Sequence, residues 1–111
     1  MTKVQGKNIW LTRGDTLEIT VGLKTRTGEP CTLGENDSIR FAMKGSYQDA
    51  EPLFIKEIPK ETMRLRLEAE ETKTLESRQQ AYVYDIQVTF WDGTVDTVID
   101  QGSIYITEEV D

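Results

Sequence analysis

An alternating segment near the end of the chain gives its clearest structural signal. Over residues 82–90, the even positions are apolar or aromatic, and polar Asp85 and Gln87 stand between them. A period of two over this length predicts a β-strand with one buried face and one solvent-facing side. Asp92-Gly93 follows directly and predicts a hairpin turn into another strand.

Other segments show the alternation or composition of strands as well. They are residues 8–12, 16–24, 37–44, 53–58, 63–67 and 94–107. In the last of them the apolar parity changes, which predicts a β-bulge near residues 100–102. Residues 70–77 break the pattern, and their acidic start predicts a short helical turn. About seven short strands with little helix indicate an all-β, antiparallel two-sheet sandwich, folded as a single domain over residues 1–111.

Strand parity also predicts which side chains form the core. The inward positions expected to be buried together are Leu17, Ile19, Val21, Phe41, Leu65, Tyr84, Ile86 and Val88. A domain of 111 residues is long enough to bury such a core without covalent cross-links. The single cysteine, Cys31, excludes an internal disulfide.

Charge and composition narrow the classes of partner. The chain has 13 basic and 20 acidic residues, which gives a net charge of −7. This excess of acid argues against binding to nucleic-acid phosphates or to an anionic membrane. The sequence has no signal-peptide pattern and no membrane span. We therefore expect synthesis in a cytoplasm, with no secretion by a signal peptide.

The candidate chemistry is sparse. The chain contains no histidine, the side chain best suited to proton transfer at neutral pH and the commonest metal ligand. Residues 92–96 lack the acidic spacing of a calcium loop. Glu68, Glu70 and Glu71 cluster, but so polar a run is typical of a solvated surface. We expect no catalytic, cofactor-binding or metal-binding residues and no enzymatic activity; a small enzyme built on glutamates is the last alternative.

One tripeptide of the chain matches a known binding motif. Arg13-Gly14-Asp15 matches the integrin-binding tripeptide. Three residues match often by chance, and glycine with aspartate is also what a tight turn requires. We interpret this tripeptide as a turn between two strands.

Four side chains are candidates for contact with a partner protein: Tyr47, Phe54, Trp91 and Tyr105. Trp91 and Tyr105 lie on the parity opposite to the core. Prolines bracket residues 53–58, which predicts an edge strand, and Phe54 has the parity opposite to its neighbours. Phe54 is therefore expected on or near an open surface. An exposed edge with apolar residues favours strand addition or subunit contact, so we expect self-association or docking through this strand or the neighbouring Tyr47 loop.

The order of these features resembles a known group of domains. The matching segments are Thr12-Arg13-Gly14-Asp15-Thr16, Thr27-Gly28-Glu29-Pro30, Ser38 to Lys44, Glu51-Pro52-Leu53, Tyr82 to Val88 and Asp92-Gly93-Thr94. Over roughly residues 9–107 the chain resembles the small immunoglobulin-like domains of phage and prophage structural proteins. The greatest likeness is to the N-terminal domain of baseplate upper proteins from phages of Gram-positive bacteria.

The resemblance implies a non-catalytic virion structural protein, in a baseplate, tail or head decoration. It would dock onto other phage structural proteins, with a homo-oligomer as a further possibility, and would need no cofactor. The chain ends at residue 111 without the long C-terminal region of a baseplate upper protein, so the expectation is either a stand-alone small structural protein or a head or tail decoration. The alternative function is a carbohydrate-binding module that uses Trp91 and Tyr105.

Overall fold

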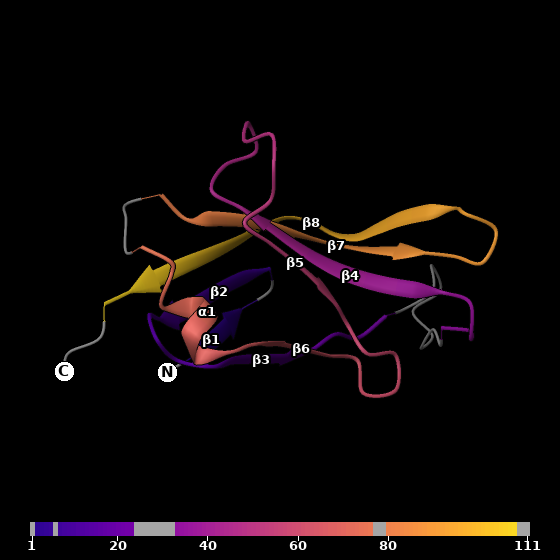
Figure 1. Cartoon of the computed structure of the whole chain (residues 1–111), viewed down its shortest axis with the longest axis horizontal. Coiled ribbons are helices and arrows are strands. Elements are labelled where there is room, and N and C mark those ends of the chain that lie inside the picture. Colours follow the sequence, from indigo (N-terminus) through magenta and orange to yellow (C-terminus); the bar gives the residue numbers. More distant parts are fainter. Residues whose placement is uncertain (1, 6, 24–32, 77–79, 109–111) are drawn as a thin grey trace.

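The fold is all-β. The computed structural model describes residues 2–5, 7–23, 33–76 and 80–108, with the backbone alone for residues 2–5 and 99–101. In chain order the elements are β1 (Thr2–Gln5), β2 (Asn8–Thr12), β3 (Leu17–Thr20), β4 (Ser38–Lys44), β5 (Phe54–Glu57), β6 (Arg64–Leu67), α1 (Ala69–Thr72), β7 (Tyr82–Thr89) and β8 (Val95–Thr107) (Figure 1). The predicted strands are confirmed, and β1 is an additional strand.

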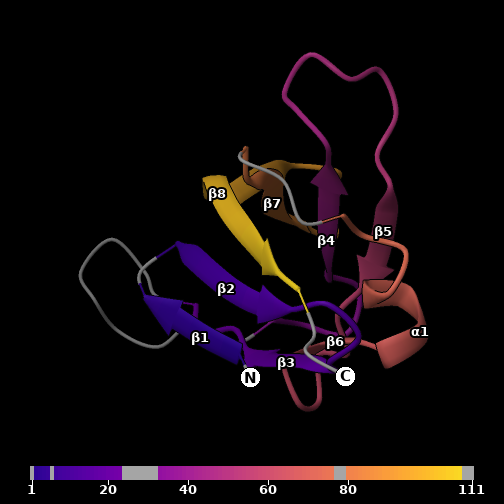
Figure 2. The ribbon, with the colours of Figure 1, turned by 90° about the vertical axis from the view of Figure 1, so that its left-hand side faces the viewer.

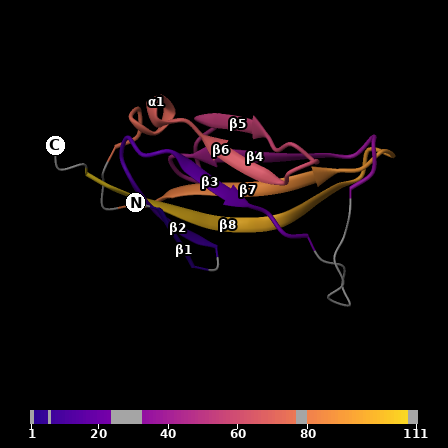
Figure 3. The ribbon, with the colours of Figure 1, turned by 90° about the horizontal axis from the view of Figure 1, so that it is seen from below.

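The strands form two layers. The larger sheet has six strands in the order β1-β2-β8-β7-β4-β5, and β3 pairs with β6 in a second, two-stranded sheet. The β2–β8 pair is parallel, whereas the other pairs are antiparallel. Figure 3 shows β3 and β6 lying over one face of the larger sheet. The predicted sandwich is therefore confirmed.

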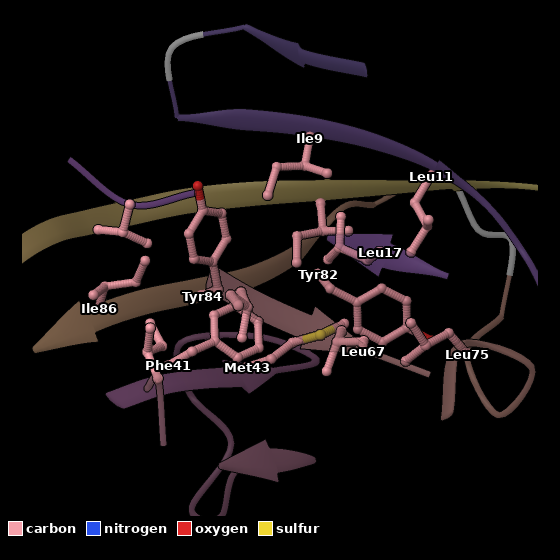
Figure 4. Close-up of a cluster of buried hydrophobic side chains, with 14 of the residues drawn as sticks. Ile9, Leu11, Leu17, Phe41, Met43, Leu67, Leu75, Tyr82, Tyr84 and Ile86 are labelled. Carbon is pink, nitrogen blue, oxygen red and sulfur yellow. The ribbon is translucent and has the colours of Figure 1, made fainter. Parts of the chain in front are cut away.

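The core lies between these two layers. The inward side chains of β4 and β7 alternate with outward ones along the whole of each strand. They meet Leu17 of β3 and Leu67 of β6, with Ile9 and Leu11 of β2 closing the side (Figure 4). All the expected core residues are buried except Ile19, which is half-buried and packs against the cluster.

A bulge in β8 lies next to Gly102, the residue that pairs with Tyr84. Tyr84 pairs with Gly102 and Ile86 pairs with Ile99, so β8 has one residue more than β7 over this interval. The predicted bulge near residues 100–102 is thus confirmed. A β-carbon on Gly102 would lie 2.3 Å from the Tyr84 ring. Glycine is needed here because the ring covers the backbone of the neighbouring strand.

The position of Phe54 in β5 differs from the expected one. Phe54 pairs with Met43 on the inner face and packs against the core, half-buried. The exposed side chains are Leu53 and Ile55 instead. The expected open position of Phe54 is wrong because three consecutive apolar residues, 53–55, carry no alternation. The register with β4 sets the inward side, and that register is not visible in the segment itself.

The short helix is fixed at both ends by side chains. Glu68 and Glu71 form a capping box at its start, which satisfies backbone N–H groups that have no partner within the helix. The Thr72 hydroxyl is buried and donates to the backbone oxygen of Asp15 at 2.7 Å. Lys56 Nζ lies 2.6 Å from a Glu71 carboxylate oxygen, which ties the helix to β5. The predicted helical turn is confirmed, beginning at Ala69.

Candidate docking surface

A groove of about 420 Å³ opens on the outer face of the larger sheet, over β4, β5 and β7. Its floor includes Ala42, which pairs with Ile55 on one side and with Asp85 on the other. The hollow exists because alanine is small while its neighbours on β4, Arg40 and Lys44, are long. Ile55 is 60% exposed at one side of the groove.

A buried carboxylate oxygen lies at the groove. Asp85 Oδ1 is shielded from solvent and has no hydrogen-bond partner among the described residues. The neighbouring cation does not satisfy it, since Arg40 Nη2 donates instead to Gln87 Oε1 at 2.7 Å. A buried acceptor without a donor costs roughly 1–3 kcal/mol. The groove therefore contains a polar group whose hydrogen bond remains to be made.

The connector between β4 and β5 forms one rim of the groove. Tyr47 and Pro52 line the hollow from this loop, and Tyr47 is 59% exposed. Figure 2 shows the loop projecting beyond the body of the molecule. A turn holds its base, in which Asp49 accepts hydrogen bonds from the backbone N–H and the hydroxyl of Ser46 at 3.1 and 3.2 Å. The rim thus presents an aromatic side chain on an anchored turn.

Trp91 lies at the opposite end of the sheet, at the tip of the β7–β8 hairpin (Figure 1). The turn is closed by Phe90 N–H to the Thr94 carbonyl at 2.8 Å, and Gly93 has a φ of +87°. The Trp91 backbone N–H donates to Asp37 Oδ1 at 2.9 Å, yet its side chain is 78% exposed. The predicted turn and the predicted exposure of Trp91 are both confirmed.

Asp92 next to it is held as an anion. Its Oδ1 accepts a hydrogen bond from the Thr94 backbone N–H at 3.0 Å. That hydrogen bond lowers the pKa of Asp92 below its usual range. The hairpin tip therefore offers an exposed indole beside an exposed carboxylate.

Tyr105 is partly covered by another aromatic ring. It pairs with Trp10 across the parallel β2–β8 ladder, and the two rings stack with centroids 5.3 Å apart. Tyr105 is 37% exposed. Trp91 and Tyr105 lie beyond opposite ends of β7, a strand of 8 residues, which is roughly 25 Å at the usual rise per residue. The structure therefore does not bring these two aromatics together on one flat face.

The Arg13-Gly14-Asp15 tripeptide and the glutamate cluster both take part in contacts that stabilise the fold. Arg13 Nε donates to the backbone oxygens of Lys73 and Leu75 at 3.1 and 2.9 Å, and Gly14 has a φ of +89°. The tripeptide is therefore a turn, as predicted, with a half-buried arginine. Glu68 and Glu71 serve the capping box, and Cys31 lies outside the described residues.

The chain was compared with models of known protein families, with curated proteins and with solved structures. None of these three comparisons found a match. No helix in the described part of the chain is long and apolar enough to cross a membrane. Among the same residues, no three Asp, Glu or Cys side chains gather as a metal site would require.

The groove itself was not visible in the sequence. Of the four predicted contact residues only Tyr47 lines it, while Phe54 lies on the other face, and Trp91 and Tyr105 lie elsewhere. The pairing of Ala42 with Asp85 joins positions 43 residues apart, which no local pattern reports. The signal that was available is the small alanine between Arg40 and Lys44 on an outward face.

Proposed function

We propose that this chain is a non-catalytic, immunoglobulin-like docking module of a phage or prophage particle. The observation that supports docking most directly is the outer-face groove, which is lined by the exposed side chains of Tyr47 and Ile55 and by Asp85, whose Oδ1 has no partner among the described residues. Exposed apolar surface beside a sheet edge is typical of a protein–protein contact. The phage setting rests on the resemblance of the sequence to domains of virion proteins.

The strand order supports the immunoglobulin-like assignment. The consecutive strands β8-β7-β4-β5 correspond to the G-F-C-C′ order of a variable-type domain, and the β3–β6 pair corresponds to B and E. The Tyr82 hydroxyl accepts the backbone N–H of Glu76 at 2.9 Å. A tyrosine near the start of strand F that bonds a few residues upstream is the tyrosine corner of such domains.

The carbohydrate-binding alternative has less support. It was expected to use Trp91 and Tyr105 as one platform, and these lie beyond opposite ends of β7. Stacking on a sugar would require rings on a shared open face. Titration with oligosaccharides, followed by tryptophan fluorescence, tests this alternative directly.

The test of the proposed function is incorporation into particles. In the cells that carry the gene, particles are induced, purified on a density gradient and analysed by mass spectrometry. We expect the chain at a fixed ratio to the major particle proteins. A chain that stays with soluble proteins, while complete particles assemble in its absence, contradicts the proposal.

The groove is tested in the same preparation. Ala42→Glu places a charge on the groove floor, and Ala50→Glu makes the same change at an exposed position that does not line the groove. We expect Ala42→Glu to reduce incorporation and Ala50→Glu to leave it at the parent level. Equal incorporation of the two variants would show that docking uses another surface.

A further inference from the structure

We propose that the groove receives the Trp91 hairpin tip of a second copy of this chain, so that copies associate head to tail. The inference deepens the docking role proposed above by naming the occupant of the groove. It rests on the complementarity between two surfaces of the same molecule. One has a hollow with an unpaired acceptor, and the other has a projecting ring with a donor.

The first complementarity is a hydrogen bond. The indole N–H of Trp91 is a donor only, and among the described residues no partner is found for it. Asp85 Oδ1 is an acceptor that receives no hydrogen bond from the described part of the chain. Rotation about the terminal torsion of an aspartate is broad, so the carboxylate can turn to present this oxygen to the hollow. A neutral donor suits the site because Arg40 and Lys44 already place two positive charges around one negative charge.

The second complementarity is shape and apolar surface. The hollow of about 420 Å³ lies within the range of pockets that hold small ligands, and it has room for one ring system. Its apolar lining comes from Ala42, Pro52, Ile55 and Val83, with the Tyr47 ring at the rim. Tryptophan gains most from such a setting because it buries a large apolar body and still satisfies its N–H.

The third complementarity is charge. Asp92 follows Trp91, is exposed and accepts the Thr94 backbone N–H. Lys44 lines the groove and forms no ion pair with a described residue. With the indole of one copy in the groove of another, the neighbouring carboxylate meets this ammonium. Such a charge pair at the rim fixes orientation more than it adds affinity.

The geometry makes the contact intermolecular. Trp91 follows Asp85 by six residues along an extended strand, which corresponds to roughly 20 Å. A molecule therefore cannot fill its own groove with its own hairpin. A contact between two different surfaces of identical copies is heterologous and generates rings or filaments.

The test uses two variants that each damage one surface. Trp91→Ser removes the ring and keeps the groove, and Ala42→Glu blocks the groove and keeps the ring. In sedimentation velocity we expect the parent to form species larger than dimers as its concentration rises. Each variant alone should lose at least about tenfold in association constant, as expected of an interface tryptophan and its pocket.

Mixing the two variants gives the decisive result. The intact groove of Trp91→Ser can receive the intact hairpin of Ala42→Glu, so an equimolar mixture should form a dimer and extend no further. Val95→Ser, at an exposed position on the same hairpin, is the control and should associate like the parent. Circular dichroism and thermal melts establish that each variant is folded, and Ile55→Asp replaces Ala42→Glu if the latter does not fold.

Three results would overturn the inference. A parent that stays monomeric at every concentration excludes self-association. A mixture of the two variants that stays monomeric excludes the pairing of these surfaces. A monomeric parent whose particle incorporation is still abolished by Ala42→Glu shows that the groove binds a different protein; the proposed function would then stand without this inference.

Discussion

The two faces of the β4–β7 pair differ in whether their shielded polar atoms have hydrogen-bond partners. On the inner face, Phe41 and Ile86 are fully buried, and the one polar atom of Tyr84 donates to the Lys7 carbonyl at 2.9 Å. On the outer face, Asp85 has a shielded oxygen to which no described residue donates, beside a hollow over Ala42. The same two strands therefore support a completed core on one side and an incomplete contact on the other.

This difference separates stability from assembly. A core with its hydrogen bonds satisfied has little to gain from a partner, because burial is already complete. A groove with exposed apolar walls and an unpaired acceptor gains from being covered. Substitutions on the inner face should therefore change unfolding, and substitutions on the outer face should change association.

The largest expected effect is on the inner face of β7. Ile86→Ala removes a fully buried side chain and leaves a cavity, so the free energy of unfolding should fall by about 2–5 kcal/mol. Gln87→Ala, the next residue on the outer face, should cost about 0.5–1.5 kcal/mol through its hydrogen bond to Arg40. Chemical denaturation measures both, and a loss under about 0.5 kcal/mol for Ile86→Ala would contradict the assigned register.

The next effect tests the contact between Tyr84 and the bulged strand. Gly102→Ala places a methyl group where the Tyr84 ring lies, so we expect a loss of about 1–3 kcal/mol from overpacking. Gly22→Ala is the matched control, because a β-carbon there meets no atom within 4 Å. Equal melting temperatures for the two variants would show that the ring moves aside without cost.

A smaller effect follows from the Tyr84 hydroxyl. Burial raises the pKa of Tyr84 above the ordinary 10.0. The folded state then holds this proton more tightly than the unfolded state, so the stability is complete below about pH 10 and falls as pH rises above it. Tyr84→Phe should cost about 0.5–1.5 kcal/mol at neutral pH, where it removes the hydrogen bond to Lys7.

The alkaline range distinguishes this cause from general unfolding. The difference in unfolding free energy between the parent and Tyr84→Phe should shrink as pH rises above 10, since only the parent has this phenol to ionise. Gln87→Ala keeps the Tyr84 phenol, so it is the control, and its difference from the parent should stay constant over the same pH range. A pH-independent difference for Tyr84→Phe would contradict the effect of burial.

The smallest effect concerns the tie between the helix and β5. The hydrogen bond from Lys56 lowers the pKa of Glu71 below the ordinary 4.5. The stabilisation is therefore present above about pH 4.5 and is lost as pH falls below it. The pair is partly exposed, so Glu71→Gln should cost less than about 1 kcal/mol at pH 7. As pH falls below 4.5, the difference in melting temperature between the variant and the parent should shrink; a difference that does not change with pH contradicts the ionic origin.

Alternation predicted the inner face because it is a local property. Along β7 every second residue from Tyr82 to Val88 is buried, as its period of two indicates. Along β5 the apolar run from Leu53 to Ile55 has no such period, and the pairing with β4 decided which side chain turned inward.

The outer groove was beyond prediction for a related reason. In the sequence, Asp85 has the pattern of an ordinary solvent-facing strand residue. Its position beside Ala42 depends on the pairing of β4 with β7, which is a long-range contact. Trp91, by contrast, has the parity opposite to the core and comes directly before Asp92-Gly93, so its exposure could be predicted from the sequence. Local patterns thus predicted the projecting ring and missed the hollow.

The measurement that tests the separation of the two faces most directly compares Ala42→Glu with Ile86→Ala. Both variants are examined by chemical denaturation for unfolding free energy and by sedimentation velocity for self-association. Ala42→Glu should lose at least about tenfold in association constant while its unfolding free energy changes by less than about 1 kcal/mol. Ile86→Ala should lose about 2–5 kcal/mol and, while folded, associate like the parent. An Ala42→Glu variant that associates like the parent, or an Ile86→Ala variant that loses association while folded, would contradict the account.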